Sequence, residues 1–235
     1  MPRKRLASIV EPRYRTLMVG LQPQPRQMPP PPFDQDALSA IFRELIQTDA
    51  YQGFAFTPDA RGAQFSSGPE DTVELRPMVF SIEAKMNGPD VLTEETAVAK
   101  VSRVFSLAAE KLEVPAFLSC GIQIVAEVDA PGGDARTFVA ETLMRGRDQA
   151  GVLGDGFFGG AVRFRDLREP GNPDEDDLSI EPDIHNDRLI FIDYKSARTT
   201  ATTGPIDLDQ VSTFVGEAFA FLDGPTMDLL SSEGE

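Results

Sequence analysis

The stretch Glu181–Ser196, EPDIHNDRLIFIDYKS, decides the fold expected for the second part of this chain. Its polar centre separates two segments, Leu178–Asp183 and Arg188–Tyr194, that are predicted to be the strands of a tight β-hairpin. A hairpin connection makes its two strands antiparallel. We therefore expect an antiparallel sheet in this part of the molecule.

Six further strands are predicted from apolar patterns that lie between turn signals. They are Tyr14–Leu21, Gly53–Phe56, Ala63–Ser66, Thr72–Met86, Phe117–Val128 and Phe157–Phe164. The strand Thr72–Met86 contains Pro77, which cannot donate a backbone hydrogen bond, so we expect that strand to bend there. The acidic segment REPGNPDEDD, residues 168–177, is predicted to be a solvated loop because of its composition.

Four helices are predicted where apolar residues recur at helical spacing after a good N-cap residue. Asp34, Thr93, Asp134 and either Asp207 or Asp209 are expected to begin them. A proline-rich connection, QPQPRQMPPPP at residues 22–32, precedes the first helix. It is predicted to be an extended segment on the surface.

The two parts of the chain share one order of elements. Residues 1–114 and residues 115–235 are each predicted to run strand, helix, three strands and helix. Antiparallel strands with one apolar face need helices over that face, and two such units can merge their sheets to cover edges. We therefore expect an α+β fold with a mainly antiparallel sheet and helices on one face.

This layout is similar to the duplicated saddle of the TATA-binding protein family and to a pair of helix-grip units. It is also similar to sporadic, uncharacterised bacterial α+β families. The resemblance to a saddle implies a broad sheet surface that is available to a partner. This resemblance of layout does not indicate which residues would bind the partner.

Charge is distributed unevenly along the 235 residues, whose net charge is −16. Residues 1–114 hold 13 basic and 15 acidic side chains, whereas residues 115–235 hold 9 basic and 23 acidic ones. Lysine and arginine supply most of the affinity for a phosphate backbone. Extensive contact with DNA or RNA is therefore not expected, least of all from the second half.

One cysteine, Cys120, and one histidine, His185, are present. An internal disulfide is therefore excluded, and a structural zinc site is not expected. No apolar run approaches the length that spans a bilayer. We expect a cytoplasmic protein of bacterial or phage type, without membrane contact.

The predicted hairpin carries the side chains best suited to chemistry. Strand alternation places Asp193 and Lys195 on one face, and Asp183 on the partner strand comes within reach if the register is right. Two carboxylates could bind Mg²⁺, which takes hard oxygen ligands, and the lysine could orient or deprotonate a water. In the other interpretation, Asp183 and Asn186 form the turn, and Asp193 and Lys195 pair locally.

The segment Glu181–Phe214 resembles the PD-(D/E)xK nuclease signature in its RecB-type form. The resemblance rests on Pro182-Asp183, on Asp193-Tyr194-Lys195-Ser196 and on the helical QVSTF that begins at Gln210. It implies that Asp183 and Asp193 bind Mg²⁺, that Lys195 is the catalytic lysine and that Gln210 supports the site.

Two positions depart from that signature. Phe214 stands where the family has a tyrosine, and no upstream helix carries an obvious acidic ligand in the expected place, for which Glu141 is the one candidate. Two other segments carry weaker signals. Gly154–Gly160 could cradle an anion or form a turn, and Asp174–Asp177 could bind Ca²⁺ or belong to a solvated loop.

The sequence favours a non-catalytic role in protein–protein interaction, as an adaptor or assembly component. The partner would be another protein or a further copy of the chain, and no cofactor is expected. The alternative is a Mg²⁺-dependent PD-(D/E)xK nuclease.

Overall fold

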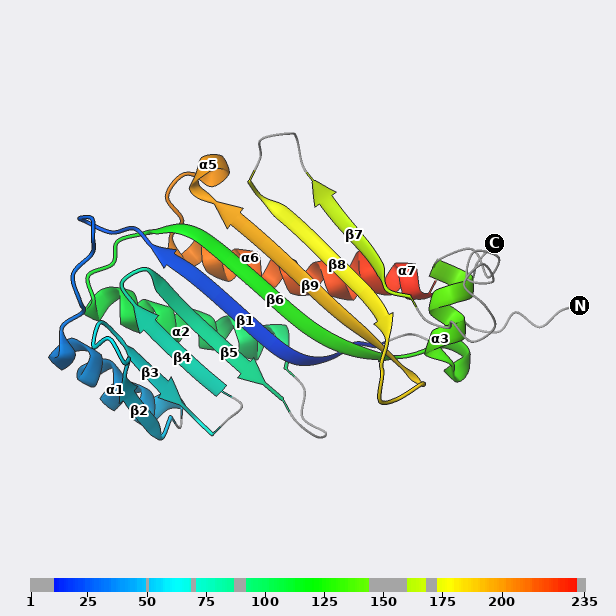
Figure 1. The fold of residues 1–235 in the computed structure, drawn as a ribbon, viewed down its shortest axis with the longest axis horizontal. Coiled ribbons are helices and arrows are strands. Elements are labelled where there is room, and N and C mark those ends of the chain that lie inside the picture. Colours follow the sequence, from blue (N-terminus) through cyan, green and yellow to red (C-terminus); the bar gives the residue numbers. More distant parts are fainter. Residues whose placement is uncertain are drawn as a thin grey trace, which may run out of the picture.

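A computed structural model describes residues 11–49, 51–68, 71–86, 92–143, 160–167 and 173–231 of the chain. Within them, nine strands form one sheet in the order β2-β3-β4-β5-β1-β6-β9-β8-β7, and all neighbours are antiparallel (Figure 1). Their bounds are β1 Arg13–Pro23, β2 Gly53–Phe56, β3 Ala63–Ser66, β4 Asp71–Arg76, β5 Val79–Lys85, β6 Phe117–Asp129, β7 Val162–Leu167, β8 Glu175–Pro182 and β9 Leu189–Thr199. The predicted α+β class is confirmed.

Strands β1 and β6 join the two halves of the chain at the middle of this sheet. Their register runs from Arg13 opposite Glu127 to Pro23 opposite Phe117, and Gly20 lies opposite Gly121. Strands β2–β5 extend the sheet on the β1 side, and β7–β9 extend it on the β6 side. The halves therefore share one continuous sheet, with β2 and β7 as its edges.

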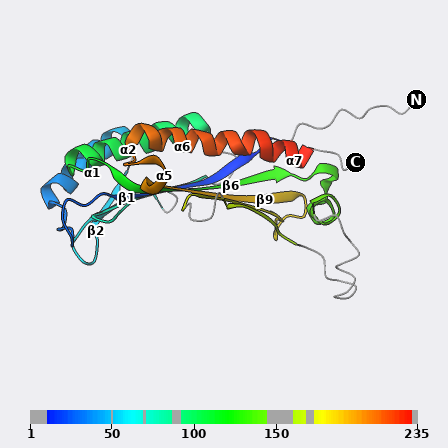
Figure 2. The same ribbon diagram turned by 90° about the horizontal axis from the view of Figure 1, so that it is seen from above.

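The long helices lie together on one face of the sheet, as expected (Figure 2). They are α1 Gln35–Asp49, α2 Glu94–Lys111 and α6 Leu208–Phe221. A π-helical turn, Leu222–Thr226, continues α6 into α7 Met227–Ser231. The shorter helices are α3 Ala135–Phe138 and α5 Thr200–Thr203.

Side-chain caps begin α2, α3 and α6 at predicted residues. The Thr93 hydroxyl accepts from the backbone N–H of Thr96, which closes a capping box at the start of α2. Asp207 begins α6 in the same way, with its carboxylate accepting from the backbone N–H of Gln210 at 2.8 Å. Each cap satisfies an N–H that has no partner inside the helix, and this fixes where the helix starts.

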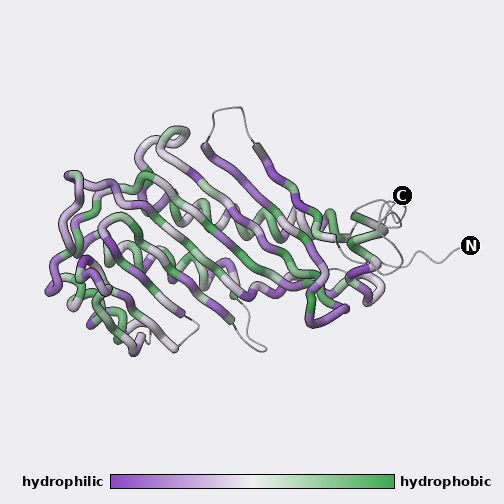
Figure 3. Tube along the Cα trace, in the orientation of Figure 1, coloured by the Kyte–Doolittle hydropathy of each residue, from purple (hydrophilic) through white to green (hydrophobic). Residues whose placement is uncertain are grey.

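The core lies between the sheet and the helices. Every second residue of the central strands points toward α2 and α6, so the strands alternate in burial. Hydrophobic residues gather in these central strands and the helices behind them (Figure 3). Fully buried members include Leu17, Leu21, Ile124, Val101, Phe105, Val215 and Phe219.

Three predicted boundaries differ from the structure. The segment Thr72–Met86 is a hairpin of β4 and β5 rather than one bent strand, because Pro77 lies in the turn between Arg76 and Val79. The first half therefore places four strands between its two long helices. Strand β7 begins at Val162 rather than near Phe157. Strand β8 begins at Glu175, so residues 175–177 are not part of a solvated loop.

Gly62 is expected to be intolerant of any side chain. A Cβ there would lie 2.0 Å from the backbone oxygen of Leu75, on the neighbouring strand β4. Gly62→Ala should lower the free energy of unfolding by about 1–3 kcal/mol or more, since the backbone must move to make room. Urea unfolding followed by circular dichroism measures this.

Gly216 in α6 is the matched control. A Cβ there meets only the mobile end of the Glu94 side chain, at 3.2 Å. Alanine is the better helix former by about 1 kcal/mol, so Gly216→Ala should leave stability unchanged or slightly raised. Equal losses of stability in the two variants would contradict the close approach of Gly62 to the backbone of β4.

Candidate functional site

One face of the sheet is covered by none of the helices described above. We call it the open face; it is turned toward the reader in Figure 1, and Figure 2 shows the helices on the opposite side. Residues directly opposite each other on neighbouring strands share a face, so the register assigns side chains to it.

Charged side chains on the open face form ion pairs within the chain. Four pairs cross between neighbouring strands and three join residues two apart on one strand. They are Arg13–Asp129, Arg15–Glu127, Arg163–Asp177, Arg165–Glu175, Arg76–Glu74, Lys85–Glu83 and Lys195–Asp193. The hydrogen bond from Arg163 lowers the pKa of Asp177, and the same contact raises the pKa of Arg163. Most of these pairs are partly exposed, so each adds little to stability.

The centre of the open face carries no charge. Ser81, Gly20, Gly121 and Ala197 follow one another across β5, β1, β6 and β9. No atom lies within 4 Å of the place where a Cβ on Gly20 would be. Met18, which is 40% exposed, stands beside this row of small residues. An uncharged centre inside a charged margin is the usual anatomy of a protein interface.

Asp193 and Lys195 lie on the open face near this centre. Lys195 Nζ is 2.8 Å from Asp193 Oδ2, and Gln123 Nε2 donates to Asp193 Oδ1 at 2.7 Å. Each carboxylate oxygen of Asp193 therefore has a side-chain partner on the sheet. Asp193 and Lys195 make the local pair that one of the two interpretations expected.

Asp183 lies away from them, in the turn of the hairpin. Its Oδ1 accepts from the backbone N–H groups of His185, at 2.6 Å, and Asn186, at 3.0 Å. Ser179 is the residue opposite Asp193, and Asp183 is four residues farther along the chain. At about 3.3 Å per residue, that separates the two aspartates by about 13 Å. The structure does not bring these two carboxylates together around one ion.

Gln210 lies on the other side of the sheet from Asp193. It belongs to the first turn of α6, where its Oε1 accepts from the backbone N–H of Asp207 at 2.9 Å. Phe214 packs against the core from the same helix. The Glu141 side chain and residues 154–159 lie outside the described residues. Within the described ranges no three histidine, cysteine or acidic side chains are placed to hold a metal ion.

A second polar cluster lies on the helix-facing side of β8 and β9, at carboxylates that the sequence suggested for Ca²⁺ or for a solvated loop. Arg198 donates to both oxygens of Asp176, at 3.1 Å each, and the Tyr194 hydroxyl donates to Asp176 at 2.9 Å. Asp174, also buried, accepts from the backbone N–H of Thr199 at 2.9 Å and caps the turn that leads into α5. This cluster ties the start of β8 to the end of β9 and is largely shielded from solvent.

Burial alone would raise the pKa of Asp176, but hydrogen bonds from Arg198, Ser196 and Tyr194 outweigh it and leave that pKa below its usual value. Burial and the neighbouring Asp176 raise the pKa of Tyr194. Cys120 is buried in β6, and burial raises the pKa of its thiol to about 12. A thiol so protonated is a poor nucleophile.

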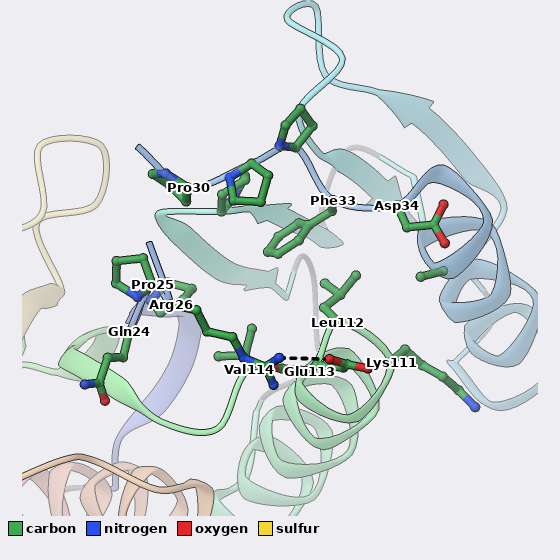
Figure 4. Close-up of a pocket in the computed structure, with 15 residues that line it drawn as sticks. Gln24, Pro25, Arg26, Pro30, Phe33, Asp34, Lys111, Leu112, Glu113 and Val114 are labelled. Carbon is green, nitrogen blue, oxygen red and sulfur yellow. Dashed lines mark hydrogen bonds and ion pairs between the residues drawn. The ribbon is translucent and has the colours of Figure 1, made fainter. Parts of the chain in front are cut away.

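A cleft of about 330 Å³ opens between the proline-rich connection and the end of α2 (Figure 4). Prolines and Phe33 form one wall, and Leu112 and Val114 form the other. Arg26 ties the connection to α2 through Glu113, at 3.1 Å. The predicted extended segment therefore lies against its own chain, and the cleft offers a mainly apolar hollow with charges at its rim.

Sequence reasoning placed Asp193 and Lys195 together but missed Arg163 and the charges of β5, and it assigned Asp177 to a Ca²⁺ site or a solvated loop. Their signal was present as alternation, because Ser81, Glu83 and Lys85 are spaced two apart on one strand. The pairing of that strand with β1, which places these charges on the open face, could not be predicted from the sequence.

No protein-family model, no curated protein and no solved structure matches this chain. None of the described helices is both long and apolar enough to cross a membrane.

Asp176→Asn is expected to destabilise the protein by about 3 kcal/mol at pH 7, because it leaves the largely buried Arg198 without its hydrogen-bonded counter-charge. The folded-state pKa of Asp176 is depressed, so its contribution is present above the unfolded value, near 4, and is lost as pH falls through the folded value. The difference between wild type and variant should therefore shrink below about pH 4. Thermal and urea unfolding across pH 2–8 measure it.

Glu217→Gln is the control, since it removes one negative charge from an exposed position of α6. Its stability should track the wild type at every pH. A wild-type advantage over Asp176→Asn that persists unchanged at pH 2 would contradict the assigned role of the Asp176 carboxylate.

Proposed function

We propose that this protein works by binding another protein chain, as an adaptor or assembly component, and that the open face is its binding surface. The observation that carries the proposal is the uncharged centre of that face, bounded by ion pairs that are already satisfied within the chain. A partner can cover these side chains without leaving any of their charges unpaired.

The size of the open face supports this role. Nine strands at a spacing of about 4.8 Å span about 38 Å. With strands of about 20 Å, the face offers roughly 800 Å², which is the area that one partner contributes to a standard interface. A stable complex could form on this face without involving the helices.

The charge of the open face argues against nucleic acid as its ligand. Its basic side chains, seven in all, are matched by eight acidic ones at positions 74, 83, 127, 129, 175, 177, 181 and 193. A phosphate backbone needs an excess of unpaired lysine and arginine. We place the protein in the cytoplasm of a bacterial or phage-infected cell, where its one thiol stays reduced.

The Mg²⁺-dependent nuclease remains the second candidate because Asp193 and Lys195 are neighbours on an uncovered surface, 2.8 Å apart. The residues that the resemblance assigns to the metal do not fit a common ion, since Asp183 is bound to the hairpin turn. Gln210 lies across the sheet. We therefore derive no catalytic step from this set.

A cleavage assay separates the two candidates. Purified protein with Mg²⁺ or Mn²⁺ should leave labelled single- and double-stranded DNA intact, because no three histidine, cysteine or acidic side chains of the described residues are placed to hold a metal ion. Lys195→Ala should behave identically and should change stability by no more than about 1 kcal/mol, since that ion pair is half exposed. Cleavage by the wild type that disappears in Lys195→Ala would establish the nuclease instead.

The binding surface is tested by placing a charge at its centre. Gly20→Lys has room for its side chain and should fold, but it should reduce co-purification of a bound protein from the source cells at least about tenfold, since a partner would bury the new charge. Quantitative mass spectrometry of tagged protein measures this.

Ala220→Lys adds the same charge to an exposed position of α6, on the helix layer, and should keep the partner. Identical sets of bound proteins for wild type, Gly20→Lys and Ala220→Lys would contradict the proposal. Thermal unfolding checks that all three chains are folded.

A further inference from the structure

We infer that the open face binds a second copy of this chain, sheet against sheet, about a two-fold axis that runs along the strands at the junction of β1 and β6. This inference rests on the proposed function and names the partner. The axis places the first half of one copy over the second half of the other.

The register of the sheet is symmetric about that junction. Ser81, Gly20, Gly121 and Ala197 form a cross-strand row with two members on each side of it. The axis exchanges the two ends of such a row. Gly20 of one copy then lies opposite Gly121 of the second copy, and Ser81 lies opposite its Ala197. Small residues meet at the centre, where the two sheets can approach without collision.

The charged residues beside this centre are complementary under the same axis. Glu83 and Lys195 are the two ends of the next cross-strand row, and Lys85 and Asp193 are the ends of the row after it. Exchange of the ends sets Glu83 against Lys195 of the second copy and Lys85 against its Asp193. Each of these positions meets the opposite sign.

The pairing of β1 with β6 extends the pattern. Arg13 is directly opposite Glu127 in the sheet. The axis therefore brings Arg13 of one copy over Glu127 of the other. Each contact occurs twice in a two-fold dimer. Three opposed pairs thus give six favourable contacts around an uncharged centre. The central row continues outward to Glu74 and Glu175, which the axis sets against each other, and each of these two carboxylates is already paired with an arginine of its own chain.

The halves of the open face also differ in net charge. On the β1 side the face carries four basic and two acidic side chains, and on the β6 side it carries three basic and six acidic ones. A two-fold axis across the strands would stack each half on itself and oppose like charges. The axis along the strands sets each half against the half of opposite net charge, so the distribution of charge favours this axis.

Met18 supplies an apolar contact at the centre. It is 40% exposed and stands two residues from Gly20 on the same strand. In the dimer it lies opposite Gln123 of the second copy, two residues from that copy's Gly121. Two sheets packed with strands nearly aligned, about 10 Å apart, are a common sandwich arrangement.

Sedimentation velocity of the full chain over a range of concentrations tests this arrangement. The wild type should sediment as a species of twice the 25.6 kDa mass of one chain. Gly20→Lys and Gly121→Asp should each weaken self-association at least about a hundredfold, since each buries an unpaired charge at the interface. Neither Cβ meets an atom closer than 3.9 Å, so both variants should fold.

An equimolar mixture of Gly20→Lys and Gly121→Asp should recover the dimer, because the axis sets the introduced lysine of one copy against the introduced aspartate of the other. Ala220→Lys should dimerise like the wild type. Recovery in the mixture also proves that each variant is folded.

A wild type that is monomeric at every concentration would overturn the inference. So would a dimer that is insensitive to both variants, or a mixture that stays monomeric. If the wild type is monomeric but Gly20→Lys still loses a different protein from the source cells, the proposed function stands and only the second copy is excluded. Failure of both measurements would overturn both.

Discussion

The antiparallel pairing of β1 with β6 is the contact on which the rest of the molecule depends. Without it, each half would expose the edge of a long strand, and unpaired edges bind other chains indiscriminately. The pairing also brings α2 and α6 together above the sheet, where the hydroxyls of Ser102 and Ser212 are 2.7 Å apart. Tyr14 of β1 reaches the C-terminal helical layer, with its ring 4.7 Å from that of Phe219. The halves therefore complete one core between them.

Elements whose local pattern and caps agree could be predicted from the sequence. The strand expected at Phe117–Val128 forms within a residue of its predicted bounds, and the helix expected to begin at Asp207 or Asp209 begins at the first of these. Pro77 shows where local evidence is insufficient. The fixed backbone φ of proline suits the first of the two central positions of a tight turn as well as a bend in a strand. Only the return of β5 along β4, with Arg76 opposite Val79, decides between them.

The shielding of Asp174, Asp176 and Asp177 from solvent, at the start of β8, could not be predicted for a similar reason. A run such as Asp174–Asp177 is costly to bury unless each carboxylate has a partner. The partners come from other strands, with Arg163 on β7 for Asp177 and Arg198 on β9 for Asp176. Composition alone therefore indicates a solvated loop, whereas the assembled sheet provides the counter-charges. The same limit applies to Asp183 and Asp193, because alternation gives the face of a side chain and not its distance along the strand.

Net charge and surface charge lead to different expectations for self-association. Two chains of net charge −16 repel each other in bulk solution, which argues against a dimer. The open face, however, holds seven basic and eight acidic side chains, so nearly all the excess negative charge lies elsewhere on the molecule. Salt screens repulsion between exposed charges over about 8–10 Å, while opposed pairs in a closed interface are screened much less. Self-association through this face should therefore strengthen as salt is added at low ionic strength, because the distant repulsion weakens before the contacts do.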